Sequence, residues 1–383
     1  MAKLKDYNGH YCESEYENAF LGFLEKAGWT YTAGNALPRA SRHEVLLETD
    51  FKEFLKENAP DLTAGEIDQL YDTVHLAGGE SDFATLHKLY GWMVFGIQFV
   101  PQNGLARMVP LINYDRPKKN IFRAVNQFVV EYTNNGQKET RRPDVLLFVN
   151  GMPLCIIELK NPAAANATIH DAWEQITIRY WRDIPHLLHY CPLACISDGV
   201  KTRLGTVRTP YEHFYAWRRV EDGDKISALP FAETETLING VYSPARFLEI
   251  FRDYIYFQDS IYDSSEVEIV CRYPQFFAAR LLKDSIVKSV KSGSGKGGTY
   301  FGATGCGKTY TMAFLARQLA LRCPDVPEIG SPTIVMIVDR EDLQKQSAKL
   351  FTRSQEFLNL GQVAVVKNRA QLRDELGKRQ SGG

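Results

Sequence analysis

Residues 142–160 read Arg-Pro-Asp-Val-Leu-Leu-Phe-Val-Asn-Gly-Met-Pro-Leu-Cys-Ile-Ile-Glu-Leu-Lys. Two apolar runs flank Asn150-Gly151, a dipeptide typical of a tight hairpin turn. The stretch therefore predicts two antiparallel strands, the first beginning at Asp144 and the second ending at Glu158 and Lys160. Because alternate residues of a strand face the same side of a sheet, Glu158 and Lys160 are predicted to share one face.

The register of this hairpin determines whether its charged residues can meet. A two-residue turn at Asn150-Gly151 pairs Asp144 with Ile157 and turns Asp144 away from Glu158. A three-residue turn places Asp144 directly opposite Glu158. A site shared by the two carboxylates therefore requires the three-residue turn or a β-bulge.

Pro143-Asp144 followed by Glu158-Leu159-Lys160 has the form of a metal-dependent phosphodiesterase site. Two carboxylates and the Leu159 carbonyl are the hard oxygen donors that Mg²⁺ prefers. A bound cation would polarise the scissile phosphate and activate water, and Lys160 would neutralise developing charge. We predict Asp144, Glu158 and Lys160 as catalytic residues, with both carboxylates as metal ligands. Because such triplets arise often by chance, an ordinary hairpin with surface charges is the alternative.

A second motif, Gly-Ala-Thr-Gly-Cys-Gly-Lys-Thr, occupies residues 302–309 and matches the phosphate-binding consensus G-x-x-x-x-G-K-[ST]. A strand-like segment precedes it and a helical run follows, so backbone amides at a helix N-terminus would face phosphate oxygens. Lys308 would reach the β- and γ-phosphates of ATP, and the Thr309 hydroxyl would coordinate Mg²⁺. The residues predicted to bind ATP through this loop are Gly302, Gly305, Gly307, Lys308 and Thr309.

The chain after this loop carries only some of the motifs of an ATP-driven motor. Residues 333–340 form a β-branched run typical of a parallel core strand. ATP turnover by a helicase-type motor needs an acidic motif at the end of a later strand. The one Asp-Glu pair after the loop, Asp374-Glu375, follows Gln-Leu-Arg and is typical of a solvated helix face. We therefore expect ATP binding without ATP turnover.

Composition limits the class of protein further. A chain of 383 residues exceeds one usual hydrophobic core, and 44% hydrophobic residues exclude wholesale disorder. With 45 basic against 46 acidic residues, nucleic-acid binding must come from local patches. The sequence shows no apolar run of membrane length and no secretory signal, and its 7 cysteines form no disulfide framework. We expect a cytoplasmic protein that contacts no membrane.

Together these motifs resemble the restriction (R) subunit of type I restriction-modification enzymes, a nuclease joined to a superfamily 2 DNA translocase. The resemblance covers nearly the whole chain and keeps both motifs in the family's order. The segments that carry it include 111–115, Val125-Asn-Gln-Phe, 142–154, 157–162, Tyr273-Pro-Gln275, 302–309 and 339–346.

This resemblance implies roles for several residues. Asp144, Glu158 and Lys160 match the family's nuclease triad. Glu17 resembles an acidic residue that such nucleases often contribute to the metal, with a solvated helix face as an equal alternative. Gln275 stands where relatives read adenine with a side-chain amide. The resemblance also implies double-stranded DNA as substrate, and methyltransferase and specificity subunits as partners.

One departure from the family pattern concerns the helix after the nuclease strands. The family has Gln-x-x-x-Tyr there, whereas Gln175 and Tyr180 are five residues apart. That spacing separates them by about 140° on an ideal helix. We keep Gln175 as a catalytic residue and predict that Tyr180 joins an apolar core stripe with Trp173 and Ile176.

The overall prediction is an α/β protein. A PD-(D/E)xK nuclease domain, a mixed sheet flanked by helices with a helical N-terminal part, is expected over 1–240. An incomplete RecA-like P-loop domain with a parallel sheet is expected over 241–383, after a linker at 221–242. The predicted function is that of a DNA-cleaving, ATP-dependent DNA-translocating subunit, here as an amino-terminal fragment. The alternatives are a P-loop regulatory or binding module with an inert nuclease-like hairpin, and a single-chain restriction-translocase.

Overall fold

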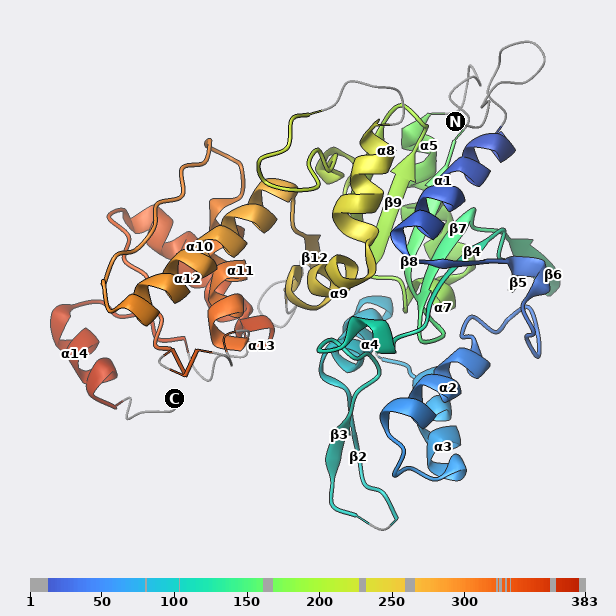
Figure 1. The fold of residues 1–383 in the computed structure, drawn as a ribbon, viewed down its shortest axis with the longest axis horizontal. Helices are drawn as coiled ribbons and strands as arrows, with labels where there is room; N and C mark the ends of the chain where they lie inside the picture. Colours follow the sequence, from blue (N-terminus) through green and yellow to red (C-terminus); the bar gives the residue numbers. More distant parts are fainter. Residues whose placement is uncertain are drawn as a thin grey trace. The chain divides into compact units, whose positions relative to one another are not determined.

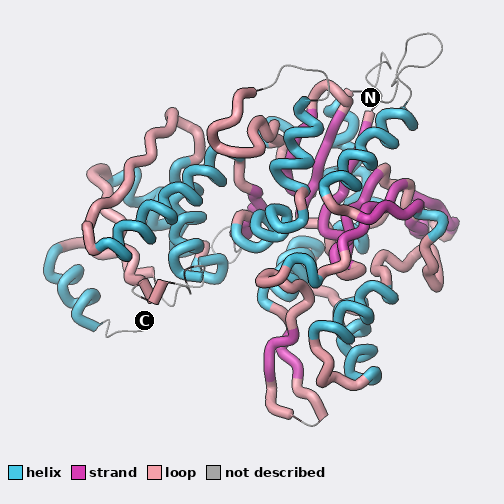
Figure 2. The backbone as a smooth tube through the Cα atoms, viewed as in Figure 1, coloured by secondary structure: helices cyan, strands magenta, loops and turns pink. Residues whose placement is uncertain are grey.

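The computed structural model describes residues 13–378 except 80, 103, 161–167, 227–231, 259–265, 322, 324–325, 328, 331 and 359–362. The chain divides into two compact units, Met1–Arg252 and Asp253–Gly383. Figure 2 shows that strands are concentrated in the first unit, whereas the second is mainly helix and loop.

A six-stranded sheet forms the centre of the first unit. Two of its neighbouring pairs, β1–β4 and β8–β9, are parallel, and the other three are antiparallel. The predicted mixed sheet is therefore confirmed. The central strands β7 and β8 are buried along their whole length, as expected of strands covered on both faces. The strand order is β1 (Thr30–Ala33), β4 (Phe122–Asn126), β7 (Val145–Val149), β8 (Met152–Leu159), β9 (Leu193–Ser197) and β10 (Thr202–Thr206).

Helices cover both faces of this sheet (Figure 1). On one face the Tyr242 hydroxyl lies 3.5 Å from Cys155 Sγ of β8. On the other face Tyr180 contacts Glu158 of the same strand. The first layer contains α1 (Glu13–Ala27), α8 (Ala232–Leu237) and the π-helical turn η5 (Ile238–Tyr242). The second contains α5 (Ile169–Glu174), the π-helical turn η3 (Gln175–Tyr180) and α6 (Trp181–Asp183).

Further helices and two hairpins complete the first unit. Helix α3 begins with a capping box, in which Thr63 accepts a hydrogen bond from the Glu66 amide and Glu66 accepts one from the Thr63 amide. The helices are α2 (Glu48–Asn58), α3 (Ala64–His75), α4 (Asp82–Phe95), α7 (Pro185–Leu188) and α9 (Pro244–Asp253). The hairpins pair β2 (Ile97–Phe99) with β3 (Arg107–Val109), and β5 (Val130–Asn134) with β6 (Gln137–Arg141).

The predicted linker at residues 221–242 is wrong for its second half. Residues 232–242 form α8 and η5, and Leu237, Ile238 and Tyr242 are fully buried. Burial of these apolar side chains holds the segment to the sheet layer, and a linker would leave them in water. The segment is therefore part of the first unit.

The second unit is built mainly from helices around a small aromatic core. The rings of Phe276 and Phe314 lie 5.0 and 5.3 Å from the ring of Tyr254. Strand β11 (Ile255–Gln258) pairs antiparallel with β12 (Val267–Val270). The helices are α10 (Tyr273–Ser292), α11 (Lys308–Leu321), α12 (Glu341–Arg353), α13 (Gln355–Leu358) and α14 (Arg369–Lys378), the last of which carries Asp374-Glu375.

The parallel strands expected around the phosphate-binding loop are not present in the part of the chain that the structure describes. Residues 298–303 and 332–338 have no strand assignment. Phe301 is 94% and Ile337 89% exposed, so neither segment is covered as a core strand would be. A parallel strand needs a neighbouring strand to complete its hydrogen bonds, and neither segment has one among the described residues. The α/β class therefore rests on the mixed sheet of the first unit.

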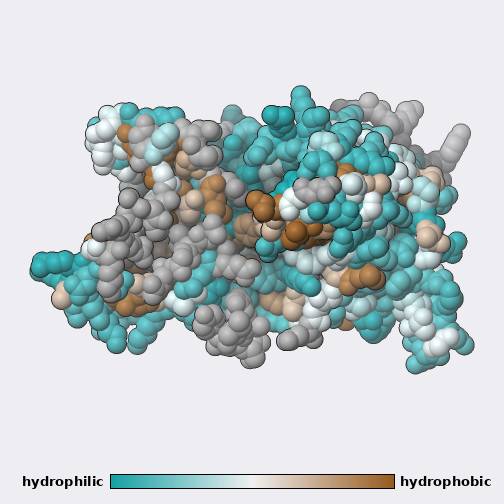
Figure 3. Space-filling model, turned by 90° about the horizontal axis from the view of Figure 1, so that it is seen from below, coloured by the Kyte–Doolittle hydropathy of each residue, from teal (hydrophilic) through white to brown (hydrophobic). Residues whose placement is uncertain are grey.

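The described surface is largely hydrophilic on the face shown in Figure 3, where hydrophobic residues appear in small separate groups. Exposed large apolar residues such as Leu76 and Leu105 lie far apart in the sequence. Among the described helices, none is both long and apolar enough to pass through a bilayer.

Candidate active site

The turn between β7 and β8 contains two residues. Asn150 has φ 51° and Gly151 has φ 78°, the pair of left-handed conformations that a two-residue type I′ hairpin requires. The Leu47 amide donates to the Gly151 carbonyl at 2.8 Å. A Cβ atom on Gly151 would collide with the Leu47 carbonyl oxygen, so only glycine fits there. Contact with a distant segment therefore holds this turn.

A β-bulge brings the two carboxylates of the hairpin together. Phe148 pairs with Pro153, whereas Leu147 pairs with Cys155, so Leu154 is an extra residue on β8. After the bulge Val145 faces Ile157, which makes Asp144 the neighbour of Glu158. The bulge thus supplies the register correction that a two-residue turn alone would lack.

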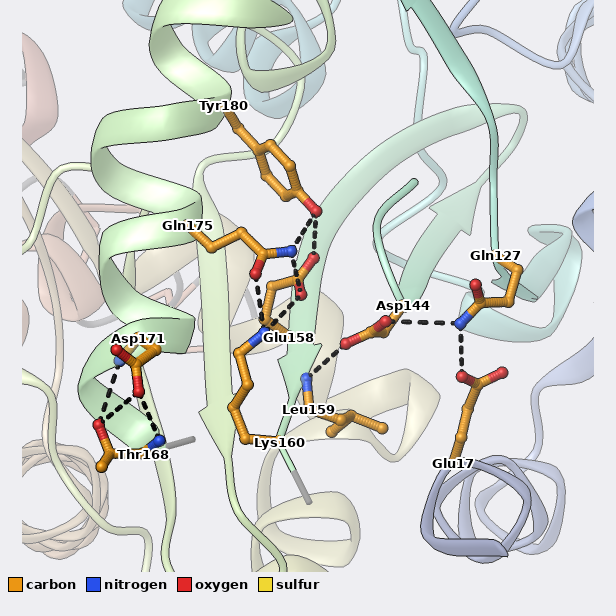
Figure 4. Close-up of polar contacts among 10 residues, drawn as sticks. All are labelled: Glu17, Gln127, Asp144, Glu158, Leu159, Lys160, Thr168, Asp171, Gln175 and Tyr180. Atoms are coloured by element: carbon orange, nitrogen blue, oxygen red, sulfur yellow. Dashed lines mark hydrogen bonds and ion pairs between the residues drawn. The ribbon is translucent and has the colours of Figure 1, made fainter. Parts of the chain in front are cut away.

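Glu158 is the centre of a buried polar cluster (Figure 4). Its side chain is fully buried, and its Oε1 accepts a hydrogen bond from the Tyr180 hydroxyl at 2.7 Å. Its Oε2 accepts one from Gln175 Nε2 at 2.8 Å and lies 3.8 Å from Lys160 Nζ. Burial raises the pKa of Glu158 well above its ordinary value, and the Asp144 carboxylate raises it further.

Gln175 links Glu158 to Lys160. Its Nε2 donates to Glu158, and its Oε1 accepts a hydrogen bond from Lys160 Nζ at 2.7 Å. The Lys160 amide donates to the Ser197 carbonyl at 2.8 Å, which ties the end of β8 to β9. The structure therefore brings Asp144, Glu158 and Lys160 together at the ends of adjacent strands, and η3 adds Gln175 to them.

The prediction that Tyr180 is only a core residue is wrong. Its ring is buried, but its hydroxyl accepts from Gln175 Nε2 at 2.7 Å and donates to Glu158. Residues 175–180 form a π-helical turn, so side chains five residues apart reach the same carboxylate. The extra residue in Gln-x₄-Tyr, compared with Gln-x₃-Tyr, is the sequence signal of such a turn. Burial and the Glu158 charge raise the pKa of Tyr180 well above its ordinary value, which keeps it a donor.

Glu17 approaches the cluster from α1 (Figure 4). Its side chain is buried, so the alternative of a solvated helix face is wrong. Glu17 Oε2 accepts a hydrogen bond from Gln127 Nε2 at 2.5 Å, and the same nitrogen lies 3.4 Å from Asp144 Oδ1. Asp144 Oδ2 accepts a hydrogen bond from the Leu159 amide at 2.8 Å. One amide group thus separates Glu17 from Asp144.

The donor atoms at this site fit a divalent cation. Among the described residues, no three His, Cys, Asp or Glu side chains gather in a metal-binding group. The candidate donors are instead the carboxylates of Asp144 and Glu158 and the Leu159 carbonyl. In a strand the N–H and C=O of one residue point toward the same neighbour, and the Leu159 N–H points to Asp144. Two neighbouring carboxylates, one of them buried, repel each other less when a cation lies between them.

The predicted phosphate-binding loop, residues 302–309, lies in the second unit and leads into a helix. Gly305 and Gly307 have φ of 79° and 80°, and α11 begins at Lys308. Lys308 Nζ donates to the carbonyls of Gly302 and Ala303, both at 2.9 Å. The loop therefore curves around the lysine ammonium at the N-terminus of a helix, the arrangement that phosphate groups favour.

Gln275 lies directly against this loop. Its Nε2 is 3.2 Å from the Gly307 carbonyl oxygen and 3.4 Å from that of Cys306. Its Oε1 accepts from the Arg272 amide at 2.8 Å. Thr309 lines an adjacent cavity of about 250 Å³, together with Gln258, Gly307, Tyr310, Gln346, Lys349, Leu350 and Arg353.

Comparison with protein families gives two matches along the chain. Residues 10–213 match the family described as type I restriction enzyme R protein N terminus. Residues 274–383 match the family described as SWI2/SNF2 ATPase. The first match covers more than half of the chain, and the two together cover most of both units.

Two similar curated proteins are named as endonuclease subunits of type I restriction enzymes. The type I restriction enzyme HindI endonuclease subunit of Haemophilus influenzae is 29% identical in an alignment 388 positions long, which spans 97% of this chain and 35% of the relative. The putative type I restriction enzyme MjaIXP endonuclease subunit of Methanocaldococcus jannaschii is 29% identical in an alignment 365 positions long. That alignment spans 88% of this chain and 34% of the relative. The chain thus spans about a third of the length of these relatives.

Proposed function

Because the chain belongs to the family of the type I restriction enzyme R protein N terminus, we propose that its first unit holds a metal-dependent DNA-cleaving site. We propose domains at 1–240 and 241–383, an endonuclease domain followed by a RecA-like ATPase domain that binds ATP. The compact units divide after Arg252 instead, so residues 241–252 belong to the first unit. The chain would act as the DNA-cleaving and translocating subunit of a type I restriction-modification system. Its partners would be double-stranded DNA and the methyltransferase and specificity subunits, in the cytoplasm.

The observation that carries this proposal is the buried carboxylate of Glu158. A fully buried acid next to Asp144 is costly, because desolvation and like charge both oppose ionisation. Three side chains, Tyr180, Gln175 and Lys160, are arranged around it. Groups held in such unfavourable environments are concentrated at functional sites.

Each side chain has a distinct role in the proposed reaction. Asp144 and Glu158 hold the cation, with Tyr180 and Gln175 fixing the orientation of the Glu158 carboxylate. A bound Mg²⁺ would supply charge that polarises a phosphodiester and lowers the pKa of an attacking water. The Lys160 ammonium, oriented by Gln175 Oε1, neutralises charge that develops on the phosphate.

ATP is proposed to bind at residues 302–309 of the second unit. Backbone amides between Gly302 and Gly307 and the Lys308 ammonium would bind the phosphates. Thr309 would supply its hydroxyl to Mg²⁺. The Gln275 amide, now directed at the loop carbonyls, would read the adenine.

Calorimetric titration with Mn²⁺ tests the nuclease site. The parent should bind Mn²⁺, and Asp144→Ala and Glu158→Ala should each lose most of that binding while retaining the parent's circular dichroism spectrum. Glu174→Ala is the matched control, because this exposed acid lies next to Gln175 but outside the cluster. Mg²⁺-dependent nicking of plasmid DNA should also be lost in Glu158→Ala. Parent-like Mn²⁺ binding by both folded variants would favour the inert module.

A further inference from the structure

The side-chain amides of Asn126 and Gln127, which are consecutive in the sequence, both donate hydrogen bonds to the Glu17 carboxylate. Asn126 Nδ2 donates to Glu17 Oε1 at 2.6 Å, and Gln127 Nε2 donates to Glu17 Oε2 at 2.5 Å. Each carboxylate oxygen therefore has its own donor. Asn126 is the last residue of β4, and Gln127 follows it directly. Glu17 thus has a fixed orientation although it comes from a separate helix.

Further contacts fix the Asn126 side-chain amide and the Gln127 backbone. The Tyr31 hydroxyl donates to Asn126 Oδ1 at 3.1 Å, so the Asn126 Nδ2 group is left to face Glu17. The backbone N–H of Gln127 donates to the backbone carbonyl of Asp144 at 2.9 Å. The main chain directly after β4 is therefore anchored to Asp144.

Gln127 also has an unusual backbone conformation. Its φ is 50°, in the left-handed region that non-glycine residues seldom adopt. Such a conformation costs about 1–3 kcal/mol and is found mostly at functional sites, where the surroundings impose it. A glycine would meet the backbone requirement without strain, but it would lack the amide. The residue at this position thus carries a side chain at an energetic cost.

We propose that Asn126 and Gln127 are positioning residues, whose amides hold the Glu17 carboxylate toward Asp144 so that it contributes to the cation site. This inference rests on the proposed function and on the metal role that the family resemblance implies for Glu17, and it adds the part that Asn126 and Gln127 play. The Gln127 nitrogen lies between the two carboxylates, at hydrogen-bond distance from Glu17 and 3.4 Å from Asp144. Without it the two negative groups would face each other with no donor between them.

The test uses Gln127→Gly in the full 383-residue chain, titrated with Mn²⁺ by calorimetry. Because glycine adopts the left-handed conformation freely, the variant should keep the backbone conformation at position 127 and the circular dichroism spectrum of the parent. Its Mn²⁺ affinity should nevertheless fall about 10- to 100-fold, the usual effect of removing a residue that orients a metal ligand. Parent-like Mn²⁺ affinity would overturn the proposal and leave Gln127 a purely structural residue.

A double-mutant cycle with Glu17→Ala separates positioning from direct binding. If Gln127 acts through Glu17, the double variant should bind Mn²⁺ as weakly as Glu17→Ala alone. Losses that multiply in the double variant would overturn the proposal. Glu158→Ala tests the proposed function separately. If Glu158→Ala loses Mn²⁺ binding while Gln127→Gly retains it, only the positioning role of Gln127 is contradicted. If Glu158→Ala binds Mn²⁺ like the parent, both the proposed function and the positioning role are contradicted.

Discussion

Tyr180 donates its hydroxyl to Oε1 of Glu158 at 2.7 Å, from a position five residues after Gln175, which binds the other oxygen of the same carboxylate. On a regular helix these two side chains would point about 140° apart. The π-helical turn at residues 175–180 removes that difference. Single π-helical turns occur often at functional sites, because the inserted residue re-aims side chains at some cost in helix geometry.

The contribution of this hydroxyl can be measured with Tyr180→Phe. Loss of the donor leaves Glu158 Oε1 buried without its partner, which should cost about 1–3 kcal/mol of unfolding free energy. Mn²⁺ affinity should fall about 10-fold, because the carboxylate loses its orientation. Tyr190→Phe is a matched control, since Tyr190 donates to the Val74 carbonyl at 2.8 Å, away from the site. It should lose stability but keep parent-like Mn²⁺ affinity, and equal affinities in both variants would contradict the prediction.

Glu158→Gln should stabilise the cation-free protein. The pKa of Glu158 is raised in the folded state, so its ionisation destabilises the fold as pH rises through that value. The advantage of the variant should therefore grow as pH rises from the ordinary pKa of a glutamate toward the raised pKa in the folded state. Each kcal/mol relieved corresponds to about 2–4 °C in a unit of this size. Mn²⁺ should raise the thermal midpoint of the parent but not that of the variant; an equal rise in both would argue against Glu158 as a ligand.

The hairpin turn should tolerate no side chain at position 151. Gly151→Ala adds a Cβ against the Leu47 carbonyl and requires a left-handed alanine, so unfolding free energy should fall by about 3 kcal/mol or more. Gly136→Ala is the control, since Gly136 has φ 79° but no atom near its Cβ position. That variant should lose only about 1–2 kcal/mol, the cost of the conformation itself. Similar losses in both would show that the Leu47 contact relaxes easily.

The pH dependence of stability in the first unit can be followed by tryptophan fluorescence during urea unfolding, because all five tryptophans lie before residue 253. Burial lowers the pKa of His186 to about 4, and His43, stacked on it at 4.3 Å, contributes to the shift. Below its ordinary pKa the unfolded chain binds the proton more readily than the folded one. Unfolding free energy should therefore fall as pH drops from about 6.5 toward 4.

His186→Phe should remove that part of the pH dependence while keeping a stacked ring. Between about pH 7 and about pH 5 the parent should lose about 1 kcal/mol more than the variant, after allowance for partial exposure. His213→Phe, at an exposed position, should leave the parent's pH dependence unchanged. An unaltered pH dependence in His186→Phe would show that other groups are responsible.

Lys308→Ala should weaken ATP binding about 10- to 100-fold, because a charge-assisted hydrogen bond to phosphate is worth about 1.5–3 kcal/mol. Calorimetric titration with ATP measures the change. Lys296→Ala removes an exposed lysine six residues before Gly302 and should retain parent-like affinity. Equal weakening in both variants would point to general electrostatic attraction.

Features that depend on neighbouring residues could be predicted from the sequence. Asn150-Gly151 indicated the hairpin turn, period-2 alternation put Glu158 and Lys160 on one face, and the glycines of residues 302–309 indicated a tight loop before a helix. The family suggested by these motifs agrees with the matches over residues 10–213 and 274–383. These features are local because their energies come mainly from backbone preferences and contacts a few residues apart.

The sequence indicated what a shared site would require, but the tertiary structure decided how the site is assembled. The bulge at Leu154, the π-helical turn before Tyr180 and the left-handed Gln127 are each less stable locally than the regular alternative. They persist because distant residues stabilise them, as the Glu158 carboxylate does for Tyr180 and Glu17 does for Gln127. The predicted strand at residues 298–303 is absent, because no described strand lies beside this segment to complete its hydrogen bonds. Long-range contacts therefore override local preference at the positions where the site is built.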